Sequence, residues 1–116
     1  MSETASSTRV LHIEDDPGIA RLVEKRLKRL RYEVSTACDG ESGLEKLQDA
    51  HFDIIVMDLQ MPGMDGLQVL KRLKNLAPHP PVIMLTGTGN EKAAVQALKL
   101  GAADYIVKDV GGGYLD

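Results

Sequence analysis

Short apolar segments alternate with segments of helical spacing along most of the chain, and this alternation limits the fold to one class. The apolar segments are 10–13, 32–36, 53–57, 82–85 and 105–107, and the segments of helical spacing are 16–30, 39–50, 65–75 and 90–101. Short apolar runs bounded by turn residues predict strands, and apolar residues three or four apart predict helices. Strands that alternate with helices predict an α/β fold, in which helices cover both faces of a parallel sheet.

The predicted order of the five strands in this sheet is 2-1-3-4-5. Right-handed crossovers leave few topologies, and this flavodoxin-like, doubly wound order is the leading one. Segment 32–36 alternates polar and apolar residues with period two, which favours a strand at the edge of the sheet. Ligands of such sheets bind beyond the carboxyl ends of the strands, so those ends are where a site is expected.

Three of the predicted helices begin at residues suited to cap them. Asp16 stands before Pro17, so a carboxylate holds the N-cap and proline holds the first helical position. Asp65 and Asn90 stand at corresponding places before the third and fourth helices, and Gly101 is placed to end the fourth. These positions predict structural roles for Asp16 and Asp65.

The composition indicates one globular domain with an aliphatic core. The chain has 116 residues, of which 43% are hydrophobic and only 3% are aromatic. Its net charge of −3 argues against direct nucleic acid binding by these residues. The single Cys38 excludes an internal disulfide framework and a metal site built from several cysteines, and we expect this side chain to be partly buried.

No secretory signal or membrane-spanning segment is visible in the sequence. Residues 1–8 are polar, and no apolar run approaches the length of a membrane span. We therefore expect residues 1–8 to form a disordered tail and residues 9–116 to form the domain. We also expect a cytoplasmic protein with no membrane partner.

Polar residues follow four of the five predicted strands. Glu14 and Asp15 follow the first strand, Asp58 the third, Thr86 the fourth and Lys108 the fifth. Because all the strands are parallel, these side chains are expected at one edge of the sheet. Together they form an acidic pocket with one hydroxyl group and one ammonium group.

The residue types in this pocket suit phosphoryl transfer. Carboxylates about 4 Å apart repel by roughly 4 kcal/mol at an effective dielectric constant near 20, so either one is protonated or a cation lies among them. Oxygen ligands favour a hard ion such as Mg²⁺ or Mn²⁺, which also attracts phosphate. Thr86 and Lys108 are then suited to bind phosphoryl oxygens, and Asp58 is placed to be the nucleophile that becomes an aspartyl phosphate.

Four short motifs at these positions carry a resemblance to a known family. They are Glu14-Asp15, the segment from Asp58 to Gly66 (DLQMPGMDG), Thr86-Gly87, and the segment from Tyr105 to Lys108 (YIVK). From Arg9 to Lys108 the chain resembles a CheY-like receiver domain of the response regulators of two-component signal transduction. The resemblance implies a signalling module that turns over no separate substrate and is therefore not an enzyme in the usual sense.

The resemblance also implies roles for the acidic residues. Asp58 is the expected phosphoacceptor, and the donor is a phosphohistidine on a sensor histidine kinase or on a histidine phosphotransfer protein. Asp15, Asp58 and the backbone carbonyl of Gln60 are the expected ligands of Mg²⁺ (or Mn²⁺). Glu14 is expected to bind the same ion through a water molecule.

Two residues are implied to respond to phosphorylation. Thr86, which with Lys108 holds the phosphoryl oxygens, is expected to move toward them. Tyr105 is expected to turn inward into the space that Thr86 releases. This movement would switch the surface formed by the fourth helix and the fifth strand.

The end of the chain departs from the family pattern. Asp109 stands where most receiver domains have proline, and the three glycines at 111–113 oppose helix formation, so we expect the fifth helix to be missing or truncated. An apolar patch of the sheet near strands one and five would then lack cover. We therefore expect a fragment of a longer, multidomain protein, with a homodimer as the alternative cover.

Three other functions fit parts of the pattern. A phosphatase with an aspartate nucleophile needs a second acid two residues after it, and that position holds Gln60. A flavin-binding protein of this fold is disfavoured by the scarcity of aromatic residues and by the lack of a hydroxyl- and glycine-rich loop after the first strand. A receiver-like interaction domain that acts without phosphorylation stays open as the alternative, because Asp109 alters the edge of the pocket.

Overall fold

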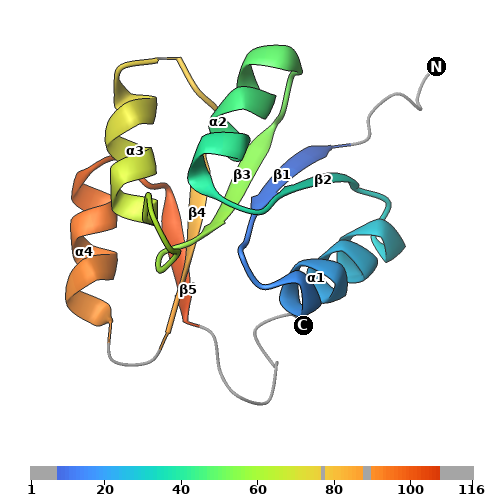
Figure 1. The fold of residues 1–116 in the computed structure, drawn as a ribbon, viewed down its shortest axis with the longest axis horizontal. Helices are drawn as coiled ribbons and strands as arrows, with labels where there is room; N and C mark the ends of the chain where they lie inside the picture. Colours follow the sequence, from blue (N-terminus) through green and yellow to red (C-terminus); the bar gives the residue numbers. More distant parts are fainter. Residues whose placement is uncertain (1–7, 77, 88–89, 108–116) are drawn as a thin grey trace.

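The computed structural model describes residues 8–76, 78–87 and 90–107 as a five-stranded sheet with four helices (Figure 1). The strands are β1 (Arg9–Ile13), β2 (Glu33–Ala37), β3 (Ile54–Asp58), β4 (Val82–Thr86) and β5 (Asp104–Val107). The helices are α1 (Pro17–Arg29), α2 (Gly40–Asp49), α3 (Gly66–Lys74) and α4 (Glu91–Lys99). The order is β2-β1-β3-β4-β5 with every neighbouring pair parallel, which confirms the predicted fold class and places β2 at an edge.

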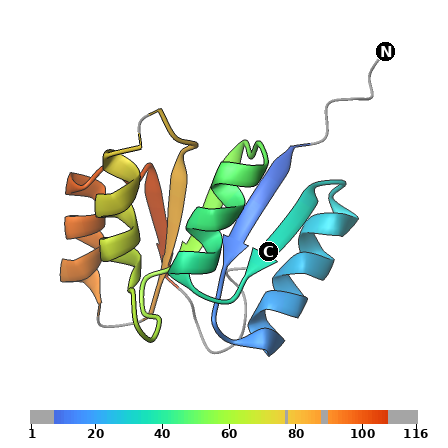
Figure 2. The same ribbon diagram turned by 45° about the horizontal axis from the view of Figure 1, so that its top comes forward.

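Helices α2, α3 and α4 lie in a row on one face of the sheet (Figures 1 and 2). Leu11, Met57 and Met84 point to this face and are completely buried. Helix α2 packs so closely on β1 that a methyl group added at Gly43 would overlap the Ile13 side chain. Packing therefore explains a glycine that costs α2 about 1 kcal/mol of helix propensity relative to alanine.

The opposite face of the sheet is apolar and only partly covered by the described residues. Helix α1 packs there against β2, and a hollow of about 360 Å³ lies beside it. The hollow is lined by Val10, Leu27, Tyr32, Ile54, Val56 and Ile83, with Thr8 and Asp53. Residues 108–116, to which the expectation of a missing or truncated fifth helix applies, lie outside the described residues.

No helix in the described ranges is long and apolar enough to cross a membrane.

The predicted caps at Asp16 and Asp65 are confirmed. The Asp16 carboxylate accepts hydrogen bonds from the backbone N–H groups of Gly18 at 2.8 Å and Ile19 at 3.2 Å. The Asp65 carboxylate accepts from the Gln68 N–H, and the Gln68 side chain accepts from the Asp65 N–H, both at 2.9 Å. This reciprocal pair is a capping box, so Asp65 serves the start of α3.

Strand β2 begins one residue later than predicted, because α1 ends in a Schellman motif. Arg31 has φ 68°, a left-handed conformation that usually selects glycine. Its N–H donates to the Lys28 carbonyl at 2.9 Å, and the Tyr32 N–H donates to the Leu27 carbonyl at 3.0 Å. Tyr32 therefore belongs to the helix end, and the strand starts at Glu33.

Cys38 is exposed, so the prediction of a partly buried side chain is wrong. Strand β2 ends at Ala37, and Cys38 therefore lies in the turn before α2 rather than in the sheet. The next residue, Asp39, caps α2 by accepting a hydrogen bond from the Ser42 N–H at 2.8 Å. This hydrogen bond lowers the pKa of the Asp39 carboxyl group.

A polar cluster lies at the amino ends of β1 and β3, whereas the predicted site lies at the carboxyl ends of the strands. The Asp53 carboxylate accepts a hydrogen bond from the Arg9 N–H at 2.8 Å and lies 3.1 Å from His51 Nε2. The Arg9 N–H and, to a smaller extent, the His51 ring lower the pKa of Asp53 from its ordinary value of 3.8. Asp53 thus joins the two strand starts.

This cluster makes stability depend on pH in the acid range. Because the pKa of Asp53 is lower in the folded state, its contribution to stability is present above the unfolded-state pKa and is lost as the pH falls through the folded-state value. We expect the free energy of unfolding in urea to fall less steeply between about pH 5 and about pH 2 in Asp53→Asn than in the native chain. Asp49→Asn, which removes an exposed carboxylate four residues earlier in the chain, is the charge-matched control, and equal slopes for Asp53→Asn and the native chain would contradict this assignment.

Candidate functional site

Three carboxyl groups meet at the carboxyl ends of β1 and β3. One oxygen each from Glu14, Asp15 and Asp58 lies within 4.8 Å of the others. Glu14 and Asp58 are 2% and 5% exposed, whereas Asp15 is open to solvent. The cluster therefore has two buried members and one member at the surface.

The two buried acids are oriented by backbone N–H groups two positions further along the chain. The Gln60 N–H donates a hydrogen bond to Asp58 Oδ1 at 3.2 Å. The Asp16 N–H donates to Glu14 Oε2, also at 3.2 Å. Asp16 thus contributes its backbone to the site while its carboxylate caps α1.

The turn after β3 brings the start of α3 against the end of the strand. A Cβ atom at position 66 would lie 2.9 Å from the Asp58 carbonyl oxygen, closer than real Cβ atoms approach other atoms, and 3.0 Å from Leu59 Cα. The Gly66 N–H also donates to the Leu59 carbonyl at 2.9 Å. Gly63, at φ 76°, provides the left-handed residue of this turn. The position of Asp58 therefore depends on glycine at 66.

The chemistry of the three acids fits a hard divalent cation. At 4.8 Å and an effective dielectric constant near 20, two carboxylate charges repel by about 3.5 kcal/mol. A cation among the oxygens removes this repulsion, and an all-oxygen donor set suits Mg²⁺ or Mn²⁺ better than Zn²⁺. The fourth predicted ligand, the backbone carbonyl of Gln60, belongs to the residue whose N–H binds Asp58.

The two predicted switch residues lie on one face of the sheet. Thr86 is the last residue of β4 and is 1% exposed. In the register of β4 and β5, Thr86 pairs with Val107 and Met84 pairs with Tyr105. Because residues two apart along a strand share a face, Thr86 and Tyr105 are diagonal neighbours on the side that α4 covers. Tyr105 is half-buried and packs against the core there.

Lys108, the predicted second ligand of the phosphoryl oxygens, lies outside the described residues, as does Asp109. The described part of β5 ends one residue earlier, at Val107.

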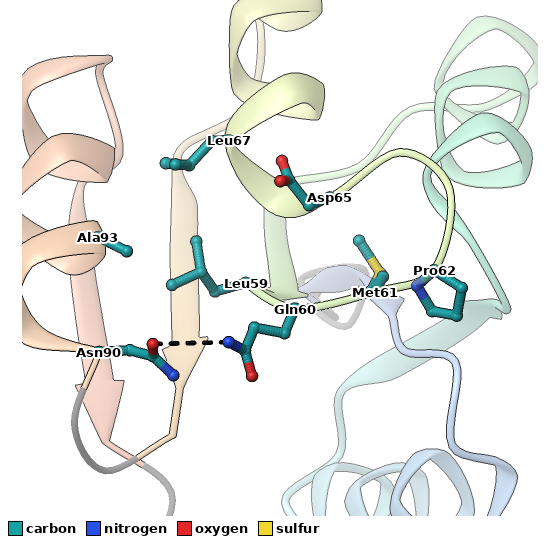
Figure 3. A pocket seen from close by; sticks show the side chains of 8 residues that line it. All are labelled: Leu59, Gln60, Met61, Pro62, Asp65, Leu67, Asn90 and Ala93. Carbon is teal, nitrogen blue, oxygen red and sulfur yellow. Dashed lines mark hydrogen bonds between the residues drawn. The ribbon is translucent and has the colours of Figure 1, made fainter.

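A groove of about 480 Å³ begins at Leu59, the residue after Asp58, and runs to the start of α4 (Figure 3). Its lining consists of Leu59, Gln60, Met61, Pro62, Asp65, Leu67, Asn90 and Ala93. Across the groove, Gln60 Nε2 donates a hydrogen bond to Asn90 Oδ1 at 3.5 Å. Asn90 precedes α4 as predicted, but its side chain does not cap the helix, so that part of the prediction is wrong.

The sequence matches the response regulator receiver domain family over residues 10–115. The transcriptional regulatory protein AfsQ1 of Streptomyces coelicolor is 40% identical over 107 residues, which are 92% of this chain and 47% of that protein. The transcriptional regulatory protein ResD of Bacillus subtilis is 36% identical over 106 residues, which are 91% of this chain and 44% of that protein. The chain thus spans about half the length of these curated relatives.

Two solved structures share the fold over most of their length. The response regulator receiver domain protein from Clostridium thermocellum matches with a TM-score of 0.85 and 32% identity, covering 93% of this chain and 87% of that one. The chemotaxis protein CheY4 of Vibrio cholerae matches with a TM-score of 0.82 and 34% identity, covering 95% of this chain and 93% of that one.

Proposed function

Because the chain belongs to the response regulator receiver domain family, whose members are signalling domains of two-component systems, we propose that it accepts a phosphoryl group on Asp58. The observation that carries this proposal is the approach of Glu14, Asp15 and Asp58 to within 4.8 Å of one another. Three acids so close together hold a cation well, and a cation is what an incoming phosphoryl group needs beside a carboxylate nucleophile. Residues 9–116 act as the receiver domain in this proposal.

The proposed metal is Mg²⁺ (or Mn²⁺). Its ligands are Asp15, Asp58 and the backbone carbonyl of Gln60, and Glu14 binds it through a water molecule. When bound, the ion offsets the negative charge of the carboxylates and of the phosphoryl oxygens. The chain itself keeps Asp58 nearly buried and oriented by the Gln60 N–H. Burial excludes bulk water, which would otherwise compete with the carboxylate for the phosphoryl group.

In the transfer step, a carboxylate oxygen of Asp58 attacks the phosphorus of a phosphohistidine on the partner. The new O–P bond forms an acyl phosphate, the P–N bond breaks, and the electron pair returns to the imidazole nitrogen, which takes a proton. Thr86 donates a hydrogen bond to one phosphoryl oxygen, and Lys108 pairs with another. Attack of water on the acyl phosphate later releases inorganic phosphate and restores the carboxylate, so the domain turns over no separate substrate.

The response to phosphorylation involves Thr86 and Tyr105. Movement of Thr86 toward the phosphoryl group opens space on the α4 side of the sheet, and Tyr105, its diagonal neighbour, turns into that space. The phosphorylated state thereby acquires a different α4–β5 surface. This account is supported by the burial of Thr86 and by the partial burial of Tyr105 on the same face.

The partner that donates the phosphoryl group is a sensor histidine kinase or a histidine phosphotransfer protein. The named relatives AfsQ1 and ResD are transcriptional regulatory proteins about twice as long as this chain, so we propose that the output belongs to another domain or to a partner. These residues do not bind nucleic acid directly in this proposal. The alternative is a homodimer, in which a second copy of the chain covers the apolar face beside α1.

Magnesium is expected to control both stability and phosphorylation. With Mg²⁺ and acetyl phosphate, intact mass should show one phosphate on the native chain, and with EDTA it should show none. Saturating Mg²⁺ should also raise the free energy of unfolding, by about 2.7 kcal/mol at a hundredfold excess over its dissociation constant. Asp15→Asn should reduce both effects.

Asp16→Asn is the matched control for this experiment. Asparagine is as good an N-cap as aspartate, so the variant removes an adjacent exposed charge while retaining the start of α1. It should therefore respond to Mg²⁺ like the native chain. Absence of phosphate uptake in the native chain with Mg²⁺ would instead favour a receiver-like interaction domain that works without phosphorylation.

A further inference from the structure

The start of α4 differs from the starts of the other three helices in the described residues. Asp16, Asp39 and Asp65 each accept a hydrogen bond from a backbone N–H in the first turn of their helix. Asn90 holds the corresponding position, because its carbonyl accepts the first helical hydrogen bond from the Ala94 N–H at 3.0 Å. Its side chain, however, accepts no hydrogen bond from the first turn of α4.

The Asn90 side chain instead binds Gln60, which lies two residues after the proposed phosphoacceptor Asp58. Its Oδ1 accepts a hydrogen bond from Gln60 Nε2 at 3.5 Å, and Figure 3 shows the two side chains directed toward each other across the groove. The backbone N–H of Gln60 donates at the same time to Asp58 Oδ1. Gln60 therefore contacts both the acceptor carboxylate and the residue that precedes α4.

The Asn90 side chain has an alternative partner in the first turn of α4. A hydrogen bond of 3.5 Å between two exposed or half-buried neutral groups is long and therefore weak. The alternative is to accept a hydrogen bond from the N–H of Lys92 or Ala93, which are the second and third residues of α4 and the usual donors to an N-cap side chain. The Asn90 backbone has φ −106° and ψ 28°, whereas the three capping aspartates are extended, so capping of α4 requires a rotation of the Asn90 backbone as well as release from Gln60.

We propose that Gln60 and Asn90 are positioning residues that couple the state of Asp58 to the first turn of α4, an inference that rests on the proposed phosphorylation of Asp58. A phosphoryl oxygen is charged and accepts a hydrogen bond more strongly than the neutral carbonyl of asparagine. The Gln60 carboxamide therefore turns from Asn90 to the phosphoryl group. Asn90 is released and caps α4, so phosphorylation orders the first turn of this helix.

Hydrogen exchange at the amides of Lys92 and Ala93 reports this change directly. The native chain is compared alone and with Mg²⁺ and beryllium fluoride, a stable mimic of the acyl phosphate. An N-cap hydrogen bond corresponds to roughly a fivefold change in an equilibrium constant, so exchange at these two amides should slow by about fivefold with the mimic. Asn90→Ala should remove this slowing.

Two further variants test the coupling without any phosphoryl group. Gln60→Leu keeps the size of the side chain but removes its donor, so exchange at Lys92 and Ala93 should already be slow in the unmodified protein. The double variant Gln60→Leu/Asn90→Ala should lose that protection, because the effect of the first substitution acts through Asn90. Gln48→Leu, on the exposed side of α2, is the matched control and should leave α4 unchanged.

The outcomes separate this inference from the proposed function. If intact mass shows phosphate on Asp58 while exchange at the two amides is the same with and without the mimic, the coupling is wrong and the phosphoacceptor assignment stands. If no phosphate is taken up, the proposed function fails. In that case unchanged exchange in Gln60→Leu contradicts the competition for Asn90 as well, and slowed exchange supports it.

Discussion

Asp58→Asn is expected to abolish phosphate incorporation. The substitution keeps the shape of the side chain but replaces the nucleophilic carboxylate with an amide, which does not form an acyl phosphate. Asp58 is the only carboxylate at the end of β3, and the described neighbours in its cluster, Glu14 and Asp15, follow β1. Incubation with Mg²⁺ and acetyl phosphate, followed by intact mass measurement, should give one phosphate on the native chain and none on the variant.

Asp53→Asn is the matched control for this substitution. It makes the same chemical change five residues earlier, before β3 begins, and leaves the acidic cluster intact. This variant should take up phosphate like the native chain. Full incorporation into Asp58→Asn would move the acceptor to another residue.

Gly66→Ala is expected to lower the free energy of unfolding by about 1 to 3 kcal/mol, the usual cost of forcing extra atoms into a closely packed place. The added Cβ would lie 2.9 Å from the Asp58 carbonyl oxygen, and backbone atoms cannot move aside as the end of a flexible side chain can. The shift needed to relieve this contact also displaces the acceptor. Urea denaturation should therefore show a lower midpoint, and phosphate uptake with Mg²⁺ should be slower.

Gly87→Ala serves as the control for Gly66→Ala. Among the described residues, the nearest neighbour of its added Cβ would be Asn90 Nδ2 at 3.5 Å, which is ordinary van der Waals contact. Its free energy of unfolding should be unchanged or up to about 1 kcal/mol higher, because alanine restricts the unfolded chain. Equal stability of Gly66→Ala and Gly87→Ala would contradict the close approach of α3 to β3.

The topology and most helix starts follow from local sequence patterns. The spacing of apolar residues depends on which side of each helix or strand is buried. The carboxylates of Asp16 and Asp65 accept hydrogen bonds from backbone N–H groups in the first turns of the helices that they precede. These signals lie within a few residues of the structures they predict. The meeting of Asp15 with Asp58 is predictable for a different reason, since parallel strands bring their carboxyl ends to one edge.

The features that sequence reasoning missed depend on contacts or conformations without a local signal. Arg31 adopts a left-handed conformation that normally indicates glycine, so the helix end that includes Tyr32 was not visible as a pattern. Asn90 has the residue type of a cap, yet its side chain binds Gln60, which is 30 residues away in the chain. Cys38 is exposed because β2 ends one residue before it, and strand ends are poorly marked in sequence.

The most direct test of the central claim is to identify the residue whose side chain carries the phosphate. Borohydride reduces an acyl phosphate to an alcohol, which converts a phosphorylated aspartate into homoserine. Trypsin cleavage after Lys46 and Lys71 places Asp58 on one peptide together with Asp49, Asp53 and Asp65. After phosphorylation with Mg²⁺ and reduction, tandem mass spectrometry of this peptide is expected to show homoserine at position 58. Homoserine at any of the other three positions, or outside this peptide, would contradict the account.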